Sequence, residues 1–184
     1  LGFGLCYASD RVVTPRTITS NYSYSNDGVY SGGGSSMDLL SVLAFVAGNT
    51  EHLRLLPLVM VLPYRNPINT AKVLSTIDVI SSGRLIVGCG VGWMREEFEI
   101  LGAPPYSNRG DVSDEYIQAF KELWTSETPT FQGRYCSFSD IIFEPKPVQK
   151  PHPPIWIGGE SPRALKRAAN LGNGWCPAGV NRDF

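Results

Sequence analysis

The chain has 184 residues, of which 42% are hydrophobic, and its 16 basic and 17 acidic side chains give a formal net charge of −1. This length can bury a substantial core, so we expect a single globular domain spanning residues 1–184. The basic residues are scattered, which excludes a stripe that follows a phosphate backbone, and no apolar run reaches the length of a membrane span, so neither nucleic acid nor a membrane is an expected partner.

The N-terminal part of the chain predicts a strand followed by a long loop. Residues 4–9, GLCYAS, are a short apolar run typical of a buried strand, and the polar pair Asp10 and Arg11 follows it. Residues 19–38 consist mostly of Ser, Gly, Tyr and Asn. This composition fits either a disordered linker or a lid that faces a substrate.

The next elements have clear start and stop signals. Apolar residues at helical spacing predict a helix over residues 38–48, with Gly48 as its stop. The nearly continuous apolar run 53–63 predicts a strand that is covered on both faces. Asn66 and Pro67 then form a cap and first-turn pair for a helix that stops at Gly83.

The second half of the chain repeats this alternation. The predicted elements are, in order, a strand at residues 84–88, a helix from Asp111 to Trp124, a hairpin with a proline-rich crossover at 131–154, a strand at 155–159, a helix capped by Ser161 and Pro162 and ended by Gly172, and a strand from residue 174.

Repeated strand–helix units with apolar strands predict an α/β fold in which parallel strands are joined by right-handed crossovers. A doubly wound sheet and an eight-stranded barrel both meet this description. A dinucleotide-binding fingerprint needs its third glycine three residues after the second. After Gly88 and Gly90, position 93 is Trp and Gly92 falls one place early. The spacing, and the unusual residues at several strand ends, favour the barrel.

Three collinear segments carry a family resemblance: NPINTAKVLSTIDVISSGRLIVGCGVGWMREEFEILG, NRGDVSDEYIQAFKELW and FEPKPVQKPHPPIWIGGESPRALKRAANLGNGWCPAG. Together they resemble the bacterial luciferase-like superfamily, whose members are barrel enzymes that use FMN or the deazaflavin F420. The resemblance implies a (β/α)8 TIM barrel. Such a barrel takes about 250 residues, so we expect an incomplete one with its second to sixth strands present. The form GVGWMREEFEILG is most similar to the branch that uses F420, with FMN as the alternative cofactor.

The segment IGGESPRAL is the expected phosphate site. Two glycines, Gly158 and Gly159, allow the backbone to approach a ligand, and a helix N-terminus at Ser161 favours an anion. By its residues alone this is equally an ordinary capped helix. The resemblance implies that the turn, with Glu160 and Ser161, holds the cofactor phosphate. It also implies that Arg109, otherwise a solvated arginine ahead of a helix, reaches the same phosphate.

The glycine ladder Gly88, Gly90 and Gly92 has two interpretations. It either allows strand and helix to pack closely or makes room for the cofactor ring, with Trp93 as a pocket wall or a core residue. The resemblance also implies a non-proline cis peptide that supports the ring. Its expected window is residues 56–59, which Pro57 interrupts.

The catalytic residues are not identified. Relatives place an acid followed by His at the end of the second strand, where this chain has Asp10 and Arg11. Arginine does not release its proton near neutral pH, so a mechanism that needs an imidazole at this position fails. Trp93 likewise replaces the glutamate of the F420-dependent sugar-phosphate dehydrogenases, which disfavours sugar-phosphate oxidation.

The remaining signals are weaker. His52 and His152 lack the context of a metal site, so no metal is expected. The charged run REEFE at 95–99 predicts a solvated helix face. The four cysteines form no CxxC motif, and we expect reduced thiols in a cytoplasmic protein. They are Cys6, Cys89, Cys136 and Cys176.

These observations favour an oxidoreductase of the luciferase-like monooxygenase type that depends on F420 or a flavin and acts on a small molecule. A homodimer is compatible with this prediction. The alternative is a non-catalytic relative that holds a flavin or nothing. A nicotinamide dehydrogenase on a doubly wound sheet lacks its fingerprint.

Overall fold

The structure is a computed structural model that describes residues 2–32 and 34–178. Strands and helices alternate along these residues, as the sequence predicts. In chain order the elements are β1 (Leu5–Ala8), α1 (Leu39–Asn49), β2 (Arg54–Pro57), β3 (Met60–Val61), α2 (Pro67–Ile80), β4 (Val87–Gly90), α3 (Arg95–Ile100), α4 (Arg109–Thr125), β5 (Phe131–Gln132), β6 (Ser137–Phe138), β7 (Ile155–Gly158), α5 (Pro162–Leu171) and β8 (Gly174–Cys176). Short 3₁₀ helices at Leu62–Tyr64 and Tyr106–Asn108 precede α2 and α4.

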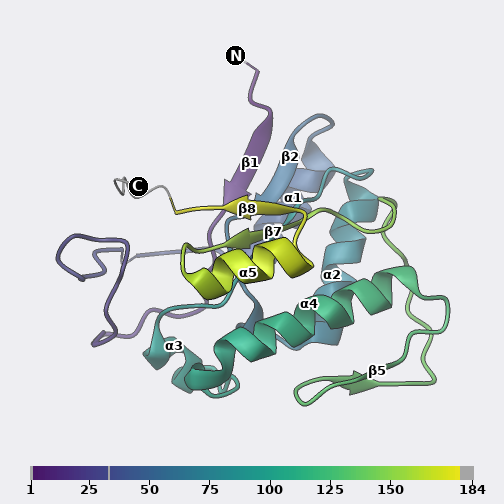
Figure 1. The fold of residues 1–184 in the computed structure, drawn as a ribbon. Coiled ribbons are helices and arrows are strands. Elements are labelled where there is room, and N and C mark those ends of the chain that lie inside the picture. The colour runs from purple at the N-terminus through teal and green to yellow at the C-terminus, as the bar shows by residue number, and fades with distance from the viewer. Residues whose placement is uncertain (1, 33, 179–184) are drawn as a thin grey trace.

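Apart from the antiparallel β5–β6 hairpin, the paired strands run parallel. β1 pairs with β2, while β3, β4, β7 and β8 follow one another in a second sheet. A bridge between Leu55 and Leu85 connects the two sheets. The expected α/β architecture with parallel strands is confirmed. The described strands form an open sheet, and they do not close into a barrel (Figure 1).

The helices cover one face of this sheet. α1 packs on α2, α2 on α4 and α4 on α5, so that the helices follow the order of the strands beneath them (Figure 1). The buried Trp124 of α4 donates from Nε1 to the carbonyl of Ala71 in α2 at 3.1 Å. The core between helices and strands is mostly aliphatic and aromatic, with Leu43, Leu55, Leu74, Ile77, Val87, Ile117, Phe120, Leu123 and Ile157 among its buried members.

Side-chain caps fix the starts of three helices, and the caps at Asn66 and Ser161 were predicted from the sequence. Asp38, Asn66 and Ser161 accept hydrogen bonds from backbone N–H groups three residues later, at 2.8, 3.1 and 3.2 Å. One stop signal is slightly displaced, because Gly48 lies inside α1, which ends at Asn49.

The predicted strand 53–63 is interrupted, which the sequence analysis did not foresee. β2 and β3 are separated by Leu58 and Val59, and the peptide bond between these two residues is cis. At this interruption the Val59 side chain lies against β4 and β7. A Cβ on Gly90 or Gly158 would lie only 2.4 or 2.7 Å from it. We call residues 57–59 the strand bulge.

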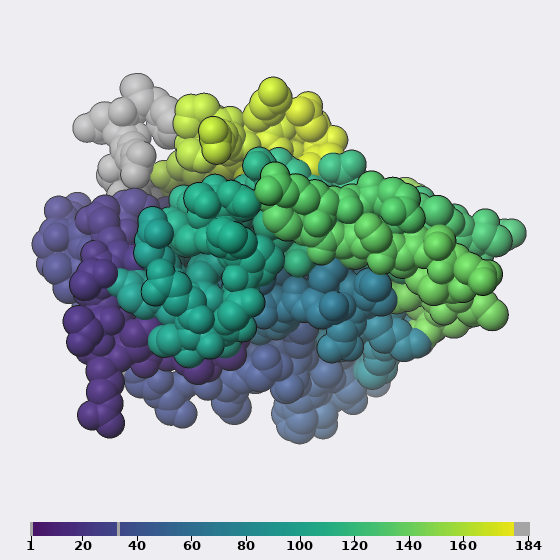
Figure 2. Space-filling model, turned by 90° about the horizontal axis from the view of Figure 1, so that it is seen from below, coloured from purple at the N-terminus to yellow at the C-terminus, as the bar shows by residue number. Residues whose placement is uncertain are grey.

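The hairpin expected within residues 131–154 is confirmed. The Glu115 carboxylate of α4 accepts hydrogen bonds from the N–H groups of Tyr135 and Cys136, both at 2.6 Å, and this contact anchors the β5–β6 turn. Figure 2 shows the green residues of this region at the opposite end of the molecule from the indigo residues that precede α1. The hairpin therefore lies far from the long loop.

Two further findings bear on the sequence analysis. All four cysteines are free thiols, as expected. Within residues 2–32 and 34–178, no helix combines the length and the apolar character that crossing a bilayer requires.

We expect alanine to have opposite effects on stability at two glycines, because only one of them packs against the strand bulge. A Cβ on Gly88 would lie 1.9 Å from the Pro57 carbonyl oxygen, whereas one on Gly48 would meet only the Ile80 methyl group at 4.0 Å. We expect Gly88→Ala to lower the free energy of unfolding by about 3 kcal/mol or more. Gly48→Ala in α1 should raise it by about 0.5–1 kcal/mol. Urea unfolding of both variants tests this, and equal effects would contradict the packing described.

Because β1 has an unpaired edge among the described strands, we expect the 184-residue chain to self-associate. β1 pairs only with β2 among the described strands, and Phe3 and Tyr7 beside and within it are 79% and 64% exposed. An unpaired strand edge with exposed apolar side chains favours pairing with other chains. We expect light scattering to show mass increasing with concentration, and Tyr7→Lys to reduce the effect more than Val79→Lys on α2. A monomer at every concentration would contradict this expectation.

Candidate functional site

The polar residues that follow β1, β3 and β4 come together at the carboxyl ends of the strands. Asp10, two residues after β1, is 8% exposed and accepts two hydrogen bonds from the Arg65 guanidinium, at 2.5 and 2.8 Å. The same carboxylate accepts from the N–H of Val61 in β3 at 2.9 Å. Asp10 therefore joins the ends of β1 and β3.

Arg11 forms an ion pair with Glu97 of α3, and its Nη1 also contacts the Met94 sulfur at 3.4 Å. Its guanidinium carbon lies 5.0 Å from the ring centre of Tyr30 and 5.5 Å from that of Trp93. The ion pair and the two rings hold the guanidinium in one orientation. The position expected to carry a family histidine thus holds a fixed cation.

Glu97 is a candidate site residue that was not predicted from the sequence. The expectation that REEFE forms a solvated face is wrong for it, because its side chain is fully buried. Besides Arg11, it accepts hydrogen bonds from the N–H groups of Val12 and Val13 at 2.9 and 3.2 Å, and from the Tyr64 hydroxyl at 2.9 Å. No local pattern separates Glu97 from the other carboxylates of the same run, because its partners lie more than thirty residues away along the chain.

The Tyr64 hydroxyl acts as a donor in this group. Burial raises the pKa of Tyr64, and the neighbouring Glu97 carboxylate raises it further. The phenol therefore remains protonated at physiological pH and donates to Glu97.

The long loop is packed against this site. Glu96 accepts from the backbone and hydroxyl of Thr19, both at 2.6 Å, and from the Ser20 hydroxyl at 2.6 Å. Tyr22 and Tyr30 lie 4.7 and 5.2 Å from Trp93 between ring centres. Of the two sequence interpretations, the structure favours a loop that covers the strand ends over a free linker. We call Tyr22, Tyr30 and Trp93 the aromatic cover.

The glycine ladder provides close packing. The space above Gly88 and Gly90 is filled by the Pro57 carbonyl and the Val59 side chain. Gly92 has a φ of +82°, and a Cβ there would lie 2.7 Å from the Phe98 ring. Gly88 and Gly90 therefore allow the strand bulge to pack directly against β4. The cis peptide expected in the window 56–59 is present despite Pro57.

The turn after β7 has the expected geometry of a glycine turn that leads into a helix. Gly159 has a φ of +99°, and Ser161 caps α5 through its hydroxyl. Glu160 accepts from the N–H of Ala178 at 3.0 Å, which ties the turn to the residues after β8. Both α4 and α5 begin on the side where β7 and β8 end, at the left of Figure 1.

Arg109 is the first residue of α4. Its Nε donates to the Gly92 carbonyl at 3.2 Å and its Nη1 to the Tyr106 carbonyl at 2.9 Å, while the guanidinium stacks on the Tyr106 ring at 3.9 Å. The structure thus connects Arg109 to the end of the glycine ladder. Among the described residues it forms no hydrogen bond with Ser161, and neither of its two hydrogen bonds uses Nη2.

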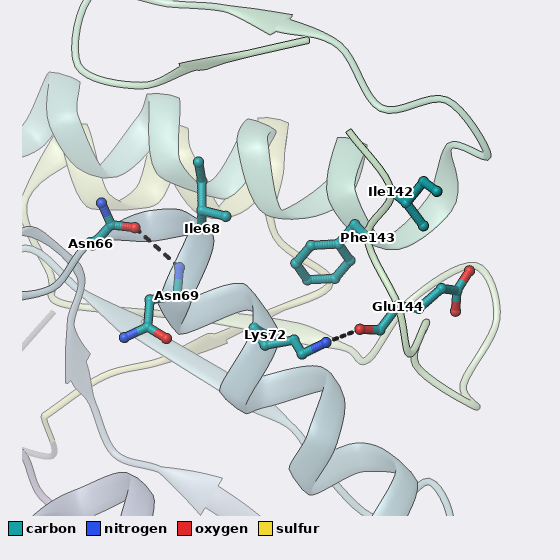
Figure 3. Close-up of a pocket in the computed structure, with 7 residues that line it drawn as sticks. All are labelled: Asn66, Ile68, Asn69, Lys72, Ile142, Phe143 and Glu144. Atoms are coloured by element: carbon teal, nitrogen blue, oxygen red, sulfur yellow. Dashed lines mark hydrogen bonds between the residues drawn. The ribbon is translucent and has the colours of Figure 1, made fainter. Parts of the chain in front are cut away.

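Two surface hollows lie outside this region. One of 480 Å³ lies between α2 and the segment with Ile142, Phe143 and Glu144, where Lys72 donates to the Glu144 carbonyl (Figure 3). The other, of 570 Å³, borders Lys146, whose amino group donates to two carbonyls near the end of α4. Their charged groups serve the fold, so we place the candidate site at the strand ends. The described residues contain no cluster of side chains suited to a metal ion.

Parallel strands with polar side chains beyond their carboxyl ends define an α/β fold, and folds of this class carry their sites at those ends. The family model for luciferase-like monooxygenase matches residues 15–184, and the chain belongs to this family. The earlier resemblance is therefore confirmed.

Individual relatives cover part of the chain. It is 37% identical to an FMNH2-dependent dimethylsulfone monooxygenase of Pseudomonas putida over 68% of the chain and 35% of that relative. An uncharacterized protein of Mycobacterium tuberculosis is 28% identical over 99% of the chain and 62% of its own length. The chain thus spans about a third to three fifths of these relatives.

Solved structures show the same fold. Monooxygenase RslO1 from Streptomyces bottropensis superimposes with a TM-score of 0.69 and 28% identity over 74% of this chain and 41% of that one. An F420-dependent secondary alcohol dehydrogenase superimposes with a TM-score of 0.76 and 20% identity over 96% of this chain and 49% of that one.

We expect the contact between Glu96 and the long loop to depend on pH. Burial raises the pKa of Glu96, but hydrogen bonds from Ser20 and Thr19 outweigh it and lower the pKa from 4.5 to about 2. Because the folded pKa is lowered, the contact is complete above about pH 4.5 and is lost as the pH falls toward 2. We expect the Trp93 indole NMR signal to change over this range.

Glu96→Gln should remove most of that pH dependence, because the amide does not titrate. Glu99→Gln, on the exposed side of the same helix, is the matched control and should behave as wild type. The interpretation fails if Glu96→Gln and the wild-type protein show the same acid transition.

Proposed function

We propose that the chain is part of an oxidoreductase that binds F420 or FMN at the carboxyl ends of its strands and acts on a small molecule. The observation that carries this proposal is the group formed by the strand bulge, the glycine turn of β7 and Arg109 on one side of the sheet, in a chain of the luciferase-like monooxygenase family. Four free thiols suit the reducing cytoplasm.

The residues present fit an anionic cofactor. α5 begins with a capped turn whose Gly159 has a positive φ, and a helix N-terminus favours a phosphate. Arg109 is held by Gly92 and Tyr106 with Nη2 unused, so it can contribute a charge-assisted hydrogen bond. We propose that Ser161 and Arg109 contact the phosphate from two different helices.

The bound ring would supply the hydride or oxygen chemistry. The protein's own residues provide position and exclude water. The strand bulge, with its cis bond at Leu58–Val59, is the surface we propose for ring support, as the family resemblance implies. The aromatic cover shields the strand ends from solvent. Arg11 keeps its proton, so it orients a partner and does not act as a base.

The choice between the two cofactors rests on opposing observations. The sequence form GVGWMREEFEILG favours F420 by resemblance, whereas the 37% identical relative is FMNH2-dependent. The non-catalytic alternative remains a separate outcome, because Arg11 stands where a histidine is expected. Titration of the intact protein with F420 and with FMN distinguishes the two cofactors from each other and from a relative that binds neither. A stronger affinity for FMN would reverse the sequence-based choice, and binding of neither would reject the proposal.

Arg109 provides the sharpest test of the phosphate site. Arg109→Ala removes a charge-assisted contact of about 1.5–3 kcal/mol, so cofactor binding should weaken about ten- to a hundredfold. Ser161→Ala should cost about 1 kcal/mol, because the backbone N–H groups of α5 remain. Arg134→Ala in the distant hairpin is the control and should leave affinity unchanged. Unaltered affinity in a folded Arg109→Ala variant would show that the phosphate lies elsewhere.

A further inference from the structure

The Nε–H group of Arg11 is an unusual hydrogen-bond donor. Its Nε is the only buried side-chain nitrogen or oxygen without a hydrogen-bond partner in the part of the chain that the structure describes. The contacts to Glu97 and Met94 both use Nη1. A buried donor without a partner costs about 1–3 kcal/mol, so native proteins rarely retain one without a reason.

The position of Arg11 suggests what that reason is. The residue lies three positions after the end of β1, near the residues that follow β3 and β4. Its guanidinium cannot turn freely to find another partner, because Glu97 holds one side and the Tyr30 and Trp93 rings face it. The unpaired Nε–H group of Arg11 is therefore held in place at the strand ends, next to the aromatic cover.

The local charges decide what kind of acceptor fits. The Arg11 charge is balanced by the buried Glu97 carboxylate, and the Asp10 carboxylate is occupied by Arg65. An anion brought to Nε would approach the Glu97 charge without an unpaired cation to offset it. A neutral oxygen acceptor forms the missing hydrogen bond without this repulsion.

The aromatic cover supplies the walls of such a site. Tyr22 and Tyr30 come from the long loop, while Trp93 follows β4, and the three rings contact one another. Aromatic walls suit a small apolar body that carries a single polar group. The loop is anchored to α3 by Glu96, so its tyrosines can lift while the Thr19 and Ser20 contact persists.

We propose that Arg11 is a substrate-recognising residue, and that its Nε–H donates to the oxygen of a small neutral molecule, such as a carbonyl or sulfone, admitted when the tyrosines of the aromatic cover lift. Glu97 is then a positioning residue that fixes the guanidinium and cancels its charge. This inference deepens the proposed function, because it names the substrate class for the same strand-end site.

Three probes of similar size separate the possibilities. Dimethyl sulfone is neutral and has oxygen acceptors, methanesulfonate adds a negative charge, and dimethyl sulfide has no oxygen. Titrations of the intact protein without cofactor are followed through the Arg11 Nε–H and Trp93 indole signals in proton–nitrogen NMR spectra. We expect saturable shifts of both signals with dimethyl sulfone, and binding at least about tenfold weaker for the other two probes.

Arg11→Lys keeps the charge but removes the Nε–H, so it should weaken dimethyl sulfone binding about tenfold, read from Trp93. Arg16→Lys, the same change at an exposed position of the same segment, should have no effect. If Arg11→Lys does not fold, the discrimination among the three probes in the wild-type protein still decides.

Equal or stronger binding of methanesulfonate would overturn the neutral-acceptor class. Absence of any shift at Arg11 would mean that a water molecule satisfies Nε, and it too would overturn the proposal. Because no cofactor is present in these titrations, such a failure is distinct from a failure of F420 or FMN to bind.

Discussion

The buried carboxylate of Glu97 is the contact on which the strand-end architecture depends. It belongs to α3 but binds the backbone after β1, the Arg11 guanidinium and the Tyr64 hydroxyl after β3. A buried carboxylate is stable only when its oxygens are paired, so each of these partners is required. Glu97 therefore fixes the relative positions of three connections that the parallel sheet alone leaves separate.

A steric constraint complements this electrostatic one. The strand bulge fits only because the adjoining strands carry glycines where its carbonyl and the Val59 side chain approach. The glycine ladder thus acts first on the protein's own backbone. The ladder and the cis peptide at Leu58–Val59 are consequently parts of one local structure.

The two halves of the proposed site differ in how they are built. The phosphate side uses helix starts, namely Ser161 of α5 and Arg109 of α4, which Arg167 holds together by an ion pair to Asp114. The substrate side uses side chains from loops, with Arg11 and the aromatic cover. Local backbone geometry dominates the first half, whereas long-range contacts dominate the second. This difference suits a family in which the cofactor class is shared and substrates vary.

The sequence by itself determined the alternation of strands and helices, the parallel arrangement and the caps at Asn66 and Ser161, because these depend on periodicity and on neighbours a few residues apart. The family also followed from the sequence. Only the tertiary structure revealed the broken strand at Val59 and the burial of Glu97, whose partners lie more than thirty residues away along the chain. A run of charged residues in a sequence predicts a solvated helix face, and only the fold shows that Arg11 pairs with Glu97. The partners of Arg11 and Arg109 were hidden for the same reason, because long-range contacts leave no local pattern.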